Sequence, residues 1–206
     1  MNAECNIFHK DVYSQNKILE ANCGFLDECF KTARELADYP KLIAQLQSIE
    51  QIFESGVYSL SSEKEKKCLR KEQEKIVNQF VPLDQKWRQF QNVYLSQKCV
   101  IPEILTEQKM GESAFNSEQS ETGCGYRLLQ ALEENKRLVL ALTTKVQKLQ
   151  QLVPIAQRAI QGQQEIERVN RLFSKEGKVS PADSERLREA EKNLKQFVQF
   201  ASSIGG

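Results

Sequence analysis

The sequence predicts an all-α protein, an elongated helical bundle or coiled coil of about five helices, one of which spans about residues 126–175. Three observations predict this fold. Apolar residues in 126–175 recur at alternating steps of four and three, the pattern of a helix whose seam repeats every seven residues. A second seam of this kind lies within 62–98. Charged residues make up 28% of the chain and its mean hydropathy is -0.55, which fits helices with narrow apolar stripes and wide solvated faces.

The predicted domain organisation is an N-terminal helical region over 1–100, a flexible linker over 101–125 and a C-terminal helical region over 126–206. Breaks in the apolar pattern and turn residues define the helices. The predicted helices span, in order, about 11–37, 41–54, 62–98, 126–175 and 181–202.

The first two predicted helices carry apolar residues at helical spacing and are separated by Tyr39-Pro40. A proline disfavours helix in the residue before it but fits the first turn of a new helix. The first helix has a row of apolar residues seven apart, namely Val12, Leu19, Leu26 and Ala33. Because neighbouring apolar residues widen this face, we expect it to be buried between two or more helices.

The third predicted helix, 62–98, opens with Ser62 and Glu65 at the spacing of a capping box. Its seam keeps phase through Pro82, which favours a kink over a restart of the helix there. The seam is rich in aromatic residues, and its distinctive members are Phe80, Trp87, Phe90 and Tyr94. Two interpretations are open for this row: a buried core, or an exposed anchor for a partner helix.

The linker is predicted because helical periodicity stops at Ile101-Pro102 and the residues from 111 to 125 are mostly Gly, Ser, Glu, Asn and Thr. A further start signal stands at Ser180-Pro181, where a serine cap is followed by a proline suited to a first turn. Within the long helix predicted over 126–175, we expect Pro154 to cause a bend.

The long helix carries a seam that is the other candidate site, either a partner surface or a core. Within it Asn135 is expected to act as a polar register mark. The seam residues after Asn135 are Val139, Leu142, Val146, Leu149 and Val153. Leucines at flanking positions such as Leu138 and Leu152 favour a bundle of three or more helices over a two-stranded homodimer. The aromatic row is the expected cover for this seam.

Composition excludes several classes of function. The chain has 29 basic and 28 acidic residues and a formal charge of +1, so it lacks the field that draws proteins to nucleic acid or anionic membranes. Its single histidine, His9, leaves no nucleophile–base arrangement, and glycine-rich phosphate loops are missing. We therefore expect no enzyme activity, no cofactor and no metal site.

The six cysteines are scattered, without a close pair of the C-x-x-C type. The sequence shows neither a signal peptide nor a transmembrane stretch. Together these features predict reduced thiols and a cytoplasmic or nuclear location.

Two functions remain as expectations. The first is a non-enzymatic interaction protein, an adaptor or assembly subunit that binds protein partners through helical surfaces as a monomer or hetero-oligomer rather than a homodimer. The alternative is a secretion-associated helical chaperone, or a bacterial effector exported without a cleaved signal. The sequence does not identify the partner or the source organism.

Overall fold

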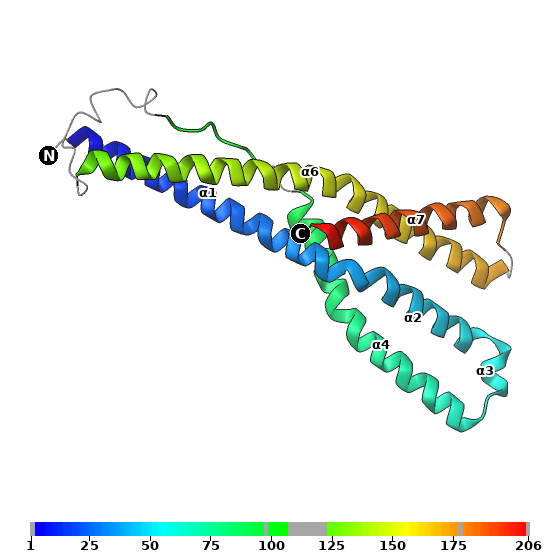
Figure 1. The fold of residues 1–206 in the computed structure, drawn as a ribbon. Helices are drawn as coiled ribbons and strands as arrows, with labels where there is room; N and C mark the ends of the chain where they lie inside the picture. Colours follow the sequence, from blue (N-terminus) through cyan, green and yellow to red (C-terminus); the bar gives the residue numbers. More distant parts are fainter. Residues whose placement is uncertain (1–2, 97–98, 107–122, 177–178, 205–206) are drawn as a thin grey trace. The chain divides into compact units, whose positions relative to one another are not determined.

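The computed structural model describes residues 3–96, 99–106, 123–176 and 179–204, and the elements with regular structure are helices (Figure 1). In chain order they are α1 (Ala3–Glu35), the 3-10 turn η1 (Leu36–Asp38), α2 (Tyr39–Glu54), α3 (Gly56–Leu60), α4 (Glu63–Gln89), the π-helical turn η2 (Phe90–Tyr94), α6 (Cys124–Glu176) and α7 (Pro181–Ser203).

The predicted all-α fold with one long helix is confirmed, since α6 covers the expected 126–175 and one or two residues beyond each end. Local start signals are confirmed as well. Ser62 and Glu65 form the capping box of α4, and Ser180 caps α7 by accepting a hydrogen bond from the Asp183 backbone N–H at 3.1 Å. The first helix begins at Ala3 rather than near residue 11.

Both interior prolines lie inside uninterrupted helices, Pro82 in α4 and Pro154 in α6. A restart of the helix at Pro82 is therefore excluded. The predicted linker over 101–125 falls largely on residues 107–122, outside the described residues, while residues 99–106 have no regular secondary structure.

The chain forms two compact units. The first comprises Met1–Glu28 and Lys98–Gln150, and the second comprises Cys29–Gln97 and Gln151–Gly206. Each unit therefore combines segments from both of the regions expected from the sequence.

In the first unit, α1 and the first half of α6 run parallel (Figure 1). Cys5 lies against Cys124 and Asn16 against Asn135, and each pair is 119 residues apart in sequence. Two helices whose contacts keep a constant sequence separation run in the same direction. Val12 packs with Leu128 and Leu132 in a small core beside the Cys5–Cys124 pair.

Cys5 and Cys124 form a disulfide with a Cα–Cα distance of 6.2 Å. The prediction that all six cysteines are reduced thiols is wrong for these two. Their distance in sequence concealed the pairing, because it arises from the parallel alignment of α1 with α6. Cys23 and Cys29 are buried, and burial raises the pKa of the Cys23 thiol.

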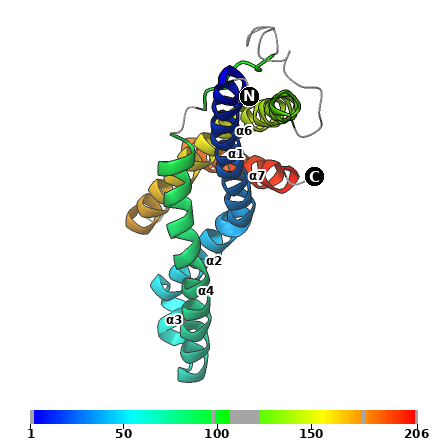
Figure 2. The same cartoon turned by 90° about the vertical axis from the view of Figure 1, so that its left-hand side faces the viewer.

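In the second unit, α2, α3 and α4 form one helical hairpin, visible from two sides in Figure 1 and Figure 2. Leu42, Ile49 and Ile76 make its core, since they face one another from α2 and α4. The second half of α6 and α7 form another hairpin. Gly162 allows these helices to approach closely, because a Cβ atom there would lie 3.0 Å from the carbonyl oxygen of Ala190.

An aromatic cluster joins these elements of the second unit. Trp87 stacks on Tyr39 with ring centroids 5.2 Å apart and meets Phe197 edge-on at 5.3 Å. The ring centroids of Phe90, at the start of η2, and Phe197 are 6.3 Å apart. Such pairs add to the free energy gained by burying aromatic area, so the cluster ties α2, α4 and α7 together.

Candidate functional site

An open groove of about 610 Å³ in the second unit is the candidate site. Three helices line it, and each contributes residues at helical spacing, so that one face of each helix looks into the groove. The lining residues are Pro40, Lys41, Ile43, Ala44 and Gln47 of α2, Gln163, Ile166 and Asn170 of α6, and Leu187, Glu191, Leu194, Lys195, Val198 and Gln199 of α7.

Part of the groove lining is apolar. Ile43, Ile166 and Val198 line the groove from the three helices and are each partly exposed, whereas Leu194, which also lines it, is buried. Partly exposed aliphatic side chains from three helices thus share one hollow, instead of being scattered singly over the surface.

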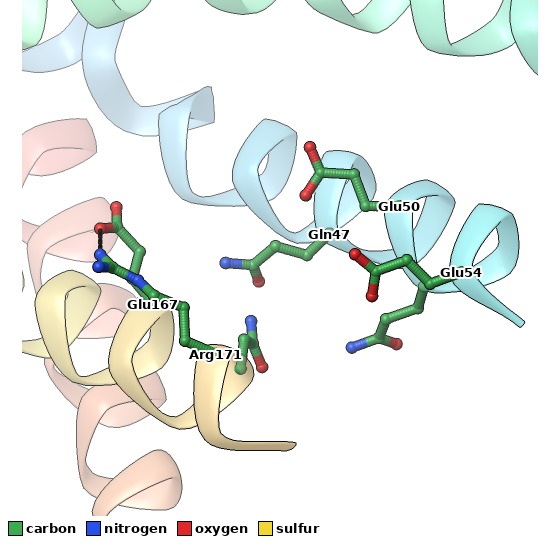
Figure 3. A pocket seen from close by; sticks show the side chains of 7 residues that line it. Gln47, Glu50, Glu54, Glu167 and Arg171 are labelled. Carbon is green, nitrogen blue, oxygen red and sulfur yellow. Dashed lines mark ion pairs between the residues drawn. The ribbon is translucent and has the colours of Figure 1, made fainter. Parts of the chain in front are cut away.

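The groove continues into a second hollow of about 500 Å³ with polar walls, shown in Figure 3. Gln47 and Asn170 line both hollows, so the two hollows are adjacent. Three carboxylates line it: Glu50 and Glu54 come from α2, and Glu167 comes from α6. The Arg171 guanidinium pairs with Glu167 at 3.5 Å.

A partly buried hydrogen-bond network adjoins the groove at Gln163. The Tyr39 hydroxyl donates to the Asp84 carboxylate at 2.7 Å and accepts from the Gln163 side-chain amide at 3.3 Å. Burial raises the pKa of the Tyr39 phenol, and the hydrogen bond to Asp84 raises it further. Through these two hydrogen bonds the phenol links α2 to α4 and α6.

The aromatic candidates from the sequence lie in the core of the second unit rather than in the groove. Trp87 is 3% exposed, Phe90 and Tyr94 are buried, and Phe80 is partly exposed and stacks on Tyr39. Because these rings are covered by the chain itself, a partner cannot reach most of them while the unit is folded. Burial favours the core interpretation of the row.

The long-helix candidates are also mostly covered. Val139, Leu142, Val146 and Leu149 are buried, and Val153 is partly exposed. In the first unit α1 lies beside the early part of α6, whereas in the second unit the aromatic row contacts Tyr39 and Phe197. The expectation that the aromatic row covers the seam stays a prediction. Apolar periodicity identifies a face that needs cover but not the helix that supplies it.

Asn135 is fully buried and takes part in a hydrogen-bond chain within the first unit. Its amide donates to the Asn16 side-chain oxygen at 2.9 Å, and its own oxygen accepts from the Leu105 backbone N–H at 3.1 Å. The Asn16 amide in turn donates to the Ala131 carbonyl at 2.9 Å. A shift of α1 along α6 would separate these partners, so the prediction that Asn135 acts as a register mark has a physical basis here.

Sequence reasoning missed Asn16 and the groove. A signal for Asn16 was present, since it lies four residues after Val12 and three before Leu19, at a seam position. The groove gave a weaker signal. Its α2 wall, Ile43, Gln47, Glu50 and Glu54, follows helical spacing but passes from apolar to acidic, and such a row resembles ordinary solvated surface.

Among the described residues, no three His, Cys, Asp or Glu side chains are grouped to hold a metal ion. None of the described helices combines the length and the apolar character that crossing a membrane requires.

The fold and groove define an all-α protein built from a parallel helix pair and two helical hairpins, with an open groove lined by three helices. Comparison of the chain with models of protein families, with curated proteins and with solved structures found no match.

Proposed function

We propose that this protein is a non-enzymatic interaction protein, an adaptor or assembly subunit that holds a partner protein through its helical surfaces. The observation that carries the proposal is the groove, where Ile43, Ile166 and Val198 remain partly exposed beside folded helices. Apolar side chains gathered in a hollow lose water when another molecule covers them, and this favours binding.

Two further observations support a protein partner and a monomer or hetero-oligomer. The formal charge of +1 gives little attraction to nucleic acid or to anionic membranes. The first part of the α6 seam is occupied by α1 of the same chain through Val12, Leu128 and Asn135. A homodimer through that part of the seam would have to displace α1.

A position-specific crosslinking experiment tests the proposal. A photo-crosslinkable amino acid replaces Ala44, which is exposed in the groove, or Ala182, an exposed alanine of α7 outside it. We expect illumination of cells that produce the full chain to give an adduct with a defined protein from position 44 but not from 182. An Ile166→Asp change should reduce that adduct. Absence of any adduct, or the same adducts from both positions, would contradict the proposal.

The disulfide favours a second candidate, a helical chaperone or an effector exported without a cleaved signal. Disulfides persist in oxidising compartments, whereas the cytosolic thiol pool keeps most cysteines reduced. A cytoplasmic or nuclear adaptor would therefore hold Cys5 and Cys124 as thiols. Mass spectrometry of protein alkylated in living cells without reductant separates the two: an intact Cys5–Cys124 link in the natural location favours the exported candidate.

A further inference from the structure

The charges along the groove are unevenly distributed. Lys41, Lys195 and one carboxylate, Glu191, are the charged residues that line the apolar hollow. The adjoining hollow holds three carboxylates, Glu50, Glu54 and Glu167, against one guanidinium, Arg171. The first set sums to a formal charge of +1 (two lysines less one glutamate) and the second to −2 (one arginine less three glutamates).

Lys41 and the α2 carboxylates Glu50 and Glu54 lie toward opposite ends of the groove, whereas Glu167 directly follows Ile166 of the apolar hollow on α6. Lys41 is in the first turn of α2, and Glu54 is the last residue of that helix, 13 residues further on and therefore roughly 20 Å away along its axis. On the other wall, α7 runs antiparallel to α6, because Gly162 lies against Ala190 while Arg168 pairs with Asp183 at 2.8 Å. Because Lys195 follows Ala190 on α7, it lies beside α6 residues that precede Gly162. Glu167 follows Gly162 and therefore lies further along α6 in the opposite direction.

From this polarity we infer that the groove takes one amphipathic α-helix of a partner protein, about 15 residues long, lying parallel to α2 with acidic residues at its N-terminal end and basic residues at its C-terminal end. The inference rests on the proposed function and specifies the partner's chemistry. An apolar stripe of this helix would cover Ile43, Ile166 and Val198.

The chemistry of a helix favours this occupant over one that lies in the opposite direction. Acidic residues near a helix N-terminus and basic residues near its C-terminus are stabilised by the helix dipole. In the parallel orientation the acidic end meets Lys41 and Lys195, and the basic end meets Glu50 and Glu54. The reverse orientation places like charges together at both ends, which weakens binding and slows encounter.

A panel of synthetic peptides tests the inference. Each peptide has about 15 residues and apolar side chains at helical spacing, in several registers, with acidic-then-basic charge order or with the order reversed. Binding to the full chain is measured by fluorescence anisotropy. At low salt we expect the acidic-then-basic peptides to bind with a dissociation constant about tenfold lower than that of their reversed counterparts. The difference should be smaller in 0.5 M salt, because the Debye length is then only about 4 Å and the charges are largely screened.

A charge-reversal variant and a matched control localise the effect. Glu50→Lys with Glu54→Lys should abolish or invert the preference, whereas Glu72→Lys with Glu185→Lys makes the same charge change at exposed positions outside the groove and should preserve it. Circular dichroism checks that both variants are folded.

Three results would overturn the inference: no saturable binding by any peptide, equal binding of both charge orders, or a preference that Glu50→Lys with Glu54→Lys leaves intact. Self-association that Ala44→Asp abolishes would also overturn it, since a second copy would then be the occupant. A partner crosslinked at position 44 without any charge preference in the peptides would leave the proposed function standing while this inference fails.

Discussion

Asn16 and Asn135 illustrate how two residues can select one pairing of long helices. Each side chain is buried, and together they satisfy one another, the Ala131 carbonyl and the Leu105 N–H. A seam made of apolar residues alone tolerates a shift by one heptad, since the same residue types meet again. A buried amide pair does not, because the shift leaves polar groups without partners.

We predict that Asn135→Ala lowers the free energy of unfolding by about 2–4 kcal/mol, because the Asn16 oxygen and the Leu105 N–H both lose a buried partner. The double change Asn16→Leu with Asn135→Leu should cost less than the single change, since it removes the amide pair as a unit. Urea unfolding followed by circular dichroism measures both. Gln130→Ala, at an exposed position of α6, is the control. A single variant within about 0.5 kcal/mol of wild type would contradict this account.

At the scale of elements, aromatic side chains fix the C-terminal part of α4 in the second unit. Trp87 contacts Tyr39 at the start of α2 and Phe197 in α7, and the π-helical turn η2 follows directly with Phe90 and Tyr94 buried. A π-helical turn changes the angular position of the residues that follow it. These aromatic side chains thus connect α4 to two other helices, in addition to the aliphatic core that Ile76 forms with α2.

The corresponding prediction is that Trp87→Ala lowers the free energy of unfolding by about 3–5 kcal/mol, because a large buried side chain is removed and a cavity remains. Val81→Ala, at a position of α4 that is 47% exposed, should change it by less than about 0.5 kcal/mol. Chemical denaturation of both variants, monitored by circular dichroism, provides the values. A loss for Trp87→Ala no larger than that for Val81→Ala would show that the cluster does not hold the unit together.

At the scale of the whole molecule, the disulfide closes a loop of 119 residues between Cys5 and Cys124. The link holds the first turns of α1 and α6 together. In the chain-entropy description, a closed loop of this length restricts the unfolded chain strongly and raises stability mainly for that reason.

We predict that reduction, or Cys5→Ser, lowers the free energy of unfolding by about 2–4 kcal/mol. Cys68→Ser is the control, because Cys68 is exposed and outside the disulfide. Denaturation with and without reductant measures the effect. If reductant changes the stability of wild type and of Cys5→Ser equally, the link contributes nothing.

Local patterns in the sequence were sufficient for the helices themselves. Seven-residue periodicity predicted α6 to within two residues at each end, and Ser62-Glu65 and Ser180-Pro181 predicted where α4 and α7 begin. These features depend on residues within one or two helical turns of each other, so they can be predicted from the order of residues in the sequence.

Tertiary structure decided which faces meet. The parallel pairing of α1 with α6, the Cys5–Cys124 link and the Asn16–Asn135 contact join residues 119 positions apart, and an apolar seam accepts many partners of similar shape. The groove likewise brings together faces of three helices that each look like ordinary surface when read alone. Periodicity determines that a face is buried or exposed, whereas its neighbour is chosen by packing and by the pairing of buried polar groups, and these become defined only when distant segments fold together.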